Sequence, residues 1–464
     1  MAVVGLSMKL LKNAAYVFGA GLLVLASVLV AQEQRLPRKL QQKVFAPAHL
    51  GGSYVLDFDH SPLNYYLPGE RDAIVRLQRR MDAGEVKLVF EPKHGYLRSV
   101  LEQLGVPVSS QGLVFSKTSF QIHKIGPKTP RAIYFNDDAY VGYVQQGDVL
   151  ELSAVDPERG AMFYTLDQLP VQKPKFQRHE ECVSCHGSGN TLGIPGLLVR
   201  SVAVDFEGRP VIAGGGFITD ENSPFAERWG GWYVTGTHGA QRHMGNLVVK
   251  DIREPDKLDV EAGANVKALS ELGVDASPYL APHSDMVALM VLQHQTRLHN
   301  IITRLAFETR LAMEWQQGLD SSFGADRAEK FSESNQRRMF GPAETLLRYM
   351  LFVDEPKLRA AVRGTSNFTQ EFSKRGPHDR HNRSLRELDL NQRLFRYPLS
   401  FLIYSEAFDA IPAPSKEYIL RRLADVLSGA DRRPEFAVLS KEDRQAILEI
   451  LTETKPEFAA LLKK

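Results

Sequence analysis

The distribution of hydrophobic and polar residues changes character near residue 250. Before this point, short runs rich in β-branched and aromatic residues alternate with turn-forming residues, which is typical of β-strands. After it, apolar residues recur at steps of three and four, which is typical of helices with one buried face. The pattern therefore predicts an α+β fold, in which a strand-rich mixed N-terminal half is followed by an all-helical C-terminal domain.

The N-terminal half contains several predicted strands joined by turns. Residues 132–135 and 140–144 flank Asn136-Asp137-Asp138 and predict a hairpin, and residues 197–205 and 210–219 flank Glu207-Gly208 and predict another. The remaining predicted strands are residues 86–90, 112–115, 149–155 and 161–166, and the predicted helices of this half are residues 69–81 and 95–104.

The clearest helix of the C-terminal half is predicted for residues 284–317. Met286, Leu289 and Met290 begin a series of apolar residues at helical spacing, and Gly318 suits its end. Further helices are predicted at residues 343–352, 385–393, 415–427 and 441–454, and the polar stretch 363–383 is predicted to be a long loop.

Residues 14–31 form an apolar run without charge, preceded by two lysines. The run is close in length to the roughly 17 to 25 residues that cross a bilayer. A cut after Ala31 would place Leu29 where a signal peptidase prefers a small residue. Residues 1–35 are therefore predicted to be a signal anchor or signal peptide, with an uncleaved anchor favoured. The rest of the chain would then lie on the periplasmic side of the bacterial inner membrane.

Composition limits the classes of function that remain. A chain of 464 residues suggests two or three domains, here residues 1–35, an α+β region at 36–250 and a helical domain at 251–464. The 57 Lys and Arg residues nearly balance the 55 Asp and Glu residues. A nucleic-acid-binding protein would show a basic excess or stripe, so nucleic acid is not an expected partner.

The only two cysteines of the chain lie in the sequence Cys182-Val183-Ser184-Cys185-His186. This C-x-x-C-H spacing is the sequence form of covalent haem c attachment. The two thiols would bond to the two vinyl groups of one porphyrin, and His186 would become the proximal ligand of the iron. The sequence therefore predicts one haem c, held by Cys182, Cys185 and His186.

Two other interpretations of the cysteine pair are weaker. A structural zinc site usually takes four protein ligands, often from two such pairs, and the chain has no second pair. A thioredoxin-like pair is expected between a strand and a helix, whereas Pro170 and Pro174 precede this motif and Gly187-Ser188-Gly189 follows it.

Residues 228–246 contain further candidates for contact with a haem. Trp229, Trp232 and Tyr233 could form an aromatic wall, and Arg228 or Arg242 could pair with a propionate, because guanidinium matches the geometry of a carboxylate. The alternative is that the aromatic residues here are buried for packing alone. Met244 is the favoured sixth ligand of the iron, with His243 and His238 behind it.

The distal position, which is the place of the sixth iron ligand, has other interpretations besides ligation by Met244. Met244 could be an ordinary apolar residue that leaves the site open, or the ligand could come from elsewhere, such as Met162. His179 is less favoured, because it lies so close before Cys182 that it would stay on the proximal side. Methionine opposite histidine raises the reduction potential and suits an electron carrier.

The chain resembles a group of large, membrane-anchored bacterial proteins with a single-haem cytochrome c domain. The resemblance is carried by residues 131–144, 179–186, 230–246 and 385–410. It implies haem c binding and electron transfer in the periplasm, with a redox partner protein there or in the inner membrane. The chain departs from small soluble cytochromes in its length and in its strand content.

Three functions share this cofactor chemistry. The first is a periplasmic electron-transfer cytochrome with one covalent haem. The second is a haem enzyme of the peroxidase or oxidase type, and the third is a haem-based sensor, both with an open distal site. The motif alone does not separate them, because the sixth ligand decides whether the iron can bind an exogenous molecule.

Overall fold

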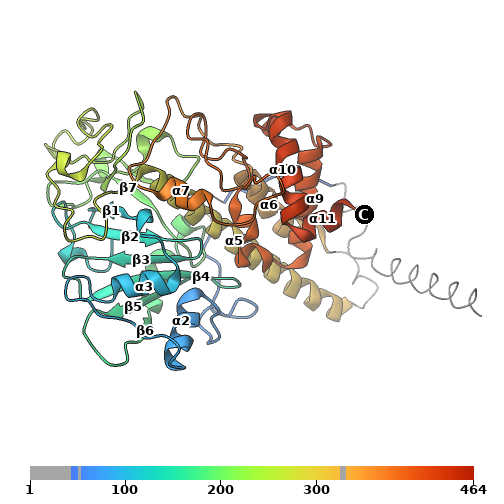
Figure 1. Ribbon diagram of the computed structural model, residues 1–464. Coiled ribbons are helices and arrows are strands. Elements are labelled where there is room, and N and C mark those ends of the chain that lie inside the picture. The colour runs from blue at the N-terminus through green and yellow to red at the C-terminus, as the bar shows by residue number, and fades with distance from the viewer. Residues whose placement is uncertain (1–42, 51–53, 324–330, 464) are drawn as a thin grey trace, which may run out of the picture.

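The computed structural model describes residues 43–50, 54–323 and 331–463 (Figure 1). The apolar run at residues 14–31 lies outside these ranges, so its predicted role as an anchor or signal remains a prediction. Within the described ranges, no helix has the length and apolarity to cross a membrane.

The N-terminal half is built around an antiparallel sheet of seven strands in the order β6-β5-β4-β3-β2-β1-β9 (Figure 1). A separate two-stranded sheet joins β7 to β8. The strands of the large sheet are β1 (Gly112–Val114), β2 (Arg131–Phe135), β3 (Ala139–Tyr143), β4 (Val149–Asp156), β5 (Gly160–Asp167), β6 (Phe176–Arg178) and β9 (Trp232–Tyr233), and those of the small sheet are β7 (Arg200–Val202) and β8 (Gly216–Ile218).

The predicted hairpins form where turn residues support them. Asn136 Oδ1 accepts hydrogen bonds from the backbone N–H groups of Asp138 and Ala139, at 3.1 and 2.8 Å, and so holds the turn between β2 and β3. Strands β4 and β5, which correspond to the predicted strands at residues 149–155 and 161–166, pair along their full length. The second predicted hairpin forms as β7 and β8, although its paired strands are shorter than expected.

The two faces of the large sheet are covered by different helices. Tyr164 of β5 donates a hydrogen bond to Asp72, which caps α2 (Ala73–Asp82), so α2 covers this face together with α3 (Leu97–Leu104) (Figure 1). Side chains alternate along a strand, so Phe163 points to the opposite face. Tyr140 of β3 is paired with Ser153 of β4, and Ser153 is paired with Phe163 of β5. The three side chains therefore lie on the same face of the sheet.

Helix α5 (Met286–Phe323) covers part of the Phe163 face and joins the sheet to the helical half (Figure 1). Gln295 of α5 donates a hydrogen bond to the hydroxyl of Tyr140 at 2.7 Å. Asp285 starts the helix by accepting from the N–H groups of Val287 and Ala288. The helix continues past its predicted end at Gly318, since glycine in a helix costs only about 1 kcal/mol relative to alanine.

The remaining helices pack against α5 or against one another, in the half of the chain where the sequence predicts helices. α6 packs along α5, α9 packs on α6, and α10 packs on α9 (Figure 1). Buried residues of both halves belong to one hydrophobic cluster. The α+β class, with an antiparallel sheet first and helices afterwards, is therefore confirmed. The helices are α6 (Glu333–Met350), α7 (Phe368–Ser373), α8 (Glu406–Asp409), α9 (Ala413–Ser428), α10 (Lys441–Thr454) and α11 (Pro456–Leu462).

Three local predictions are wrong. Residues 86–90 do not form a strand, because the N–H of Val89 donates to the side chain of Ser99 on α3 and not to a neighbouring strand. Residues 385–393 do not form a helix, because the side chain of Asp389 accepts from the N–H groups of Asn391 and Gln392 and makes a turn.

The third error is the long loop predicted at residues 363–383, which contains the short helix α7. Phe368 and Phe372 of this helix are buried against the common core. The polar residues around them hid two phenylalanines at helical spacing, which are enough to dock one turn of helix.

Candidate functional site

The C-x-x-C-H motif lies in one short helical stretch directly after the edge strand β6. A 3₁₀ turn (Glu180–Cys182) continues into α4 (Val183–His186). Residues three apart lie on the same side of a helical turn, so Cys182 and Cys185 face a common direction. Both cysteines are free thiols, with Cys185 exposed and Cys182 partly buried. The local backbone therefore presents two thiols together, with the histidine next to them.

His186 is held in the tautomer that a metal ligand needs. Its Nδ1 lies 3.0 Å from the carbonyl oxygen of Gly196, which can only accept, so Nδ1 carries the proton. Among the described residues, no group hydrogen-bonds Nε2. Burial lowers the pKa of His186, which keeps the ring neutral near pH 7. The Nε2 lone pair is thus free, and donation of the other ring N–H to a carbonyl is the usual support of a ligating histidine.

Hydrogen bonds hold the loop that follows the motif, residues 187–197, to His186 and to helix α5. The N–H of Gly196 donates to the carbonyl of His186 at 2.8 Å, so these two residues are joined twice. Asn300 of α5 accepts from the N–H of Leu197 at 2.8 Å and donates to the carbonyl of Leu197 at 2.7 Å. The buried Asn300 side chain therefore positions the loop that in turn orients His186.

The ring of Phe163 packs against His186, with ring centroids 4.7 Å apart. Phe163 lies on β5 and faces the motif, whereas its neighbour Met162 points to the opposite face. An aromatic ring beside the imidazole limits the rotation of the histidine. The sheet therefore adds a second constraint on the orientation of His186.

The thiol of Cys182 differs from that of a thiol–disulfide oxidoreductase. Burial raises its pKa to about 11, and the nearby carboxylates of Glu181 and Glu151 add to this effect. Redox-active cysteines of C-x-x-C motifs have a lowered pKa, because the thiolate is the reacting form. This environment gives no support to the thioredoxin-like interpretation.

The sheet beside the motif carries polar groups that are not fully partnered. Arg131 of β2 pairs with Glu151 of β4 at 2.6 Å, and both are close enough to affect the pKa of His186. Arg131 Nε and Ser153 Oγ are buried and have no hydrogen-bonding partner among the described residues. Buried polar groups normally have partners, so these two are available to a cofactor carboxylate.

The residues around the motif fit a covalently bound haem. The site offers two thiols, a neutral histidine with one free nitrogen, and an arginine with an unpartnered nitrogen. Phe120, which is 63% exposed, lies 6.1 Å from the ring of His179 at the edge of this region. Within the described parts of the chain, no cluster of three or more His, Cys, Asp or Glu residues could hold a bare metal ion.

The structure does not bring the other predicted haem contacts to the motif. Trp232 is buried in β9 and donates from Nε1 to the carbonyl of Arg200 at 2.8 Å. Arg242 forms an ion pair with Glu261 at 2.5 Å. In the described structure, no contact joins Trp232 or Arg242 to the residues of the motif, so their contact with a haem remains a prediction.

The candidate sixth ligands are also engaged elsewhere. Met244 belongs to a small hydrophobic cluster with Ala203 and Val249, and its sulfur accepts a hydrogen bond from Ser201 at 3.8 Å. His179 is held at both ring nitrogens, by Thr165 at 2.8 Å and by Glu181 at 2.5 Å. The assignment of Met244 as sixth ligand therefore remains a prediction without a supporting contact.

Sequence reasoning missed the residues that support the motif from a distance. Phe163, Gly196 and Asn300 lie in three separate segments and meet only in the folded chain. The motif itself is visible because its spacing is local. The sequence carries no comparable local signal for the residues that orient His186.

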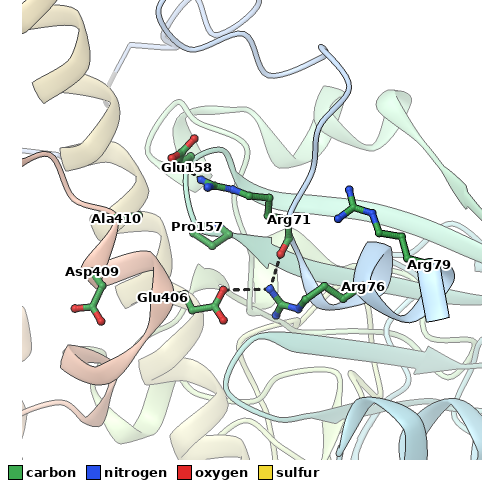
Figure 2. A pocket seen from close by; sticks show the side chains of 8 residues that line it. All are labelled: Arg71, Arg76, Arg79, Pro157, Glu158, Glu406, Asp409 and Ala410. Carbon is green, nitrogen blue, oxygen red and sulfur yellow. Dashed lines mark hydrogen bonds and ion pairs between the residues drawn. The ribbon is translucent and has the colours of Figure 1, made fainter. Parts of the chain in front are cut away.

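A pocket of about 530 Å³ lies between α2, the β4–β5 turn and α8 (Figure 2). Arg76 pairs with Glu406 at 3.1 Å, and Arg71 pairs with Glu158. The pocket contains none of the residues of the motif. Two of its three arginines are paired with its carboxylates, and it does not extend the candidate cofactor site.

No protein-family model, curated protein or solved structure matches this chain. The functional interpretation therefore rests on the motif and on the geometry around it.

Proposed function

We propose that the chain is a c-type cytochrome that carries one haem and transfers electrons. Cys182 and Cys185 form the two thioether bonds, and His186 Nε2 is the proximal ligand. The observation that carries the proposal is the hydrogen bond from His186 Nδ1 to the Gly196 carbonyl, which leaves Nε2 free beside two free thiols. The bound haem would supply an iron that alternates between the ferrous and ferric states.

The chain's own residues have distinct parts in this proposal. Gly196 and Asn300 position His186, because they fix the proton on Nδ1 and hold the loop that carries the accepting carbonyl. Phe163 limits the rotation of the imidazole. Arg131 is the candidate partner of a propionate, since its Nε is buried without a hydrogen bond.

The cellular place of this function follows from the predicted N-terminal anchor. Haem c is attached on the outer side of the bacterial inner membrane, so the proposal places residues 36–464 in the periplasm. Electron transfer then requires a redox partner protein in the periplasm or in the inner membrane. The near balance of charge along the chain gives no reason to propose nucleic acid as a partner.

The proposal is tested by expression together with a cytochrome c maturation system. The wild-type chain should retain haem through acid-acetone extraction and denaturing electrophoresis, because thioether bonds survive unfolding. Cys182→Ala combined with Cys185→Ala should abolish this retention. Ser184→Ala is the matched control, since Ser184 is exposed on the same turn and should leave retention unchanged. Retention in the double variant would refute the assignment.

A further inference from the structure

Four aromatic rings pack together in a cluster away from the C-x-x-C-H motif. They belong to Phe225, Trp229, His238 and His243. The two histidine rings have centroids 4.8 Å apart, and Trp229 lies 5.2 Å from His243. Phe225 contacts all three of the other rings, at 5.2 to 6.0 Å. Both histidines and Trp229 are almost completely buried.

Backbone groups fix the tautomer of each histidine in this cluster. The N–H of Asn265 donates to His238 Nε2 at 3.0 Å, and the N–H of Gly245 donates to His243 Nδ1 at 3.0 Å. A ring nitrogen that accepts a hydrogen bond carries no proton. The proton of each neutral ring therefore lies on the other nitrogen, which is Nδ1 of His238 and Nε2 of His243.

These two nitrogens and the indole nitrogen of Trp229 are three donors without an acceptor. Each of the three atoms is buried and has no hydrogen-bonding partner among the residues that the structure describes. Native proteins rarely leave one buried donor unpaired. Three such donors within a single cluster of contacting rings indicate a common acceptor.

The tautomers exclude a metal ion as the missing partner. A histidine ligates a metal through a nitrogen that carries no proton, and such histidines donate their other N–H to a carbonyl or carboxylate. Here the arrangement is reversed, because the nitrogens that carry no proton already accept from the backbone. The cluster therefore offers protons, which suit an anion, and offers no lone pairs, which a metal would need.

Charged groups of both signs lie near the cluster. The guanidinium of Arg228 is buried and lies 6.0 Å from the ring centroid of Phe225. It donates to the backbone carbonyls of Glu221 and Ser223. Among the described residues, no carboxylate lies within ion-pair distance of it, although Glu355, Asp220 and Glu221 are near enough for their charges to raise its pKa.

We propose that Trp229, His238 and His243 bind one small monovalent anion, of the size of a halide ion, through these three N–H groups. In the described structure, no contact joins the four rings to the C-x-x-C-H motif. Its occupation would tie residues 225–229 to residues 238–243, and so stabilise the loops that follow β8 and β9.

The test measures the thermal unfolding midpoint of the full chain at constant ionic strength, while bromide replaces gluconate. The wild-type protein should show a saturable rise of the midpoint. Trp229→Phe removes one donor with little change in shape and should reduce or abolish the rise. Trp232→Phe is the matched control, because the Trp232 N–H is already paired with Arg200 and its loss should leave the rise unchanged.

Crystals soaked in bromide give the direct readout. The proposal expects an anomalous peak within hydrogen-bond distance of the three nitrogen atoms. An ordered water without anomalous signal would overturn it, as would a bromide response of equal size in wild type and Trp229→Phe. Neither measurement depends on haem loading, so failure here leaves the proposed cytochrome function untouched.

Discussion

Replacement of Asn300 by alanine should destabilise the loop that orients His186. The side chain of Asn300 makes two hydrogen bonds to the backbone of the buried residue Leu197. An unpaired buried donor or acceptor costs about 1–3 kcal/mol, so loss of both bonds, with partial relief by water, should cost about 2–4 kcal/mol. Since each 1.4 kcal/mol is a factor of ten, amide exchange in residues 187–197 should accelerate roughly 30- to 700-fold if the whole cost falls on local opening of this loop.

Hydrogen exchange followed by mass spectrometry measures this change peptide by peptide. Asn300→Asp keeps the acceptor but loses the donor, so it should give an intermediate acceleration. Asn190→Ala is the matched control, because Asn190 is exposed on the same loop and a surface change of this kind is usually within about 0.5 kcal/mol. Unchanged exchange of residues 187–197 in Asn300→Ala would refute the positioning role of Asn300.

Three further predictions concern other parts of the molecule. Burial lowers the pKa of His299 to about 4, so as pH falls from about 6.5 the unfolded state takes up a proton that the folded state refuses. The stability of the wild type should therefore fall more steeply between pH 6.5 and 4 than that of His299→Gln, in urea titrations at several pH values; parallel curves would contradict this. Met244→Ala should remove the weak near-infrared sulfur-to-iron band of the ferric protein and lower its potential, if Met244 is the sixth ligand as the sequence predicts. A wild-type protein that lacks the band and binds carbon monoxide readily would favour the enzyme or sensor instead. A periplasmic-side reporter fused after Lys464 should be active in the membrane fraction, whereas soluble protein starting near Gln32 would show that the apolar run is a cleaved signal.

Local patterns in the sequence were enough to predict much of the fold. The β2–β3 hairpin follows from alternating residues around Asn136, whose side chain holds the turn. Helix α10 has the predicted bounds because Ser440 caps its first turn and its apolar residues recur at helical spacing. In both cases the information lies within about one element of the chain.

The remainder depended on contacts between distant segments. Strand β9 pairs with β1 across more than a hundred residues, and no local signal indicates that pairing. At residues 385–393 a side-chain turn at Asp389 competes with the helix that propensity favours. The C-x-x-C-H motif could be recognised from the sequence because, like the hairpin, it is defined by neighbouring residues. The carbonyl that fixes the tautomer of His186 could not be recognised in this way, because the chain must fold before Gly196 reaches the imidazole.

Peptide mapping of the matured protein tests the central claim most directly. After proteolysis, mass spectrometry should find one haem on the peptide that contains Cys182, Cys185 and His186, attached through both cysteines. Unmodified thiols at both positions, in a strain whose maturation system loads a control cytochrome, would contradict the account.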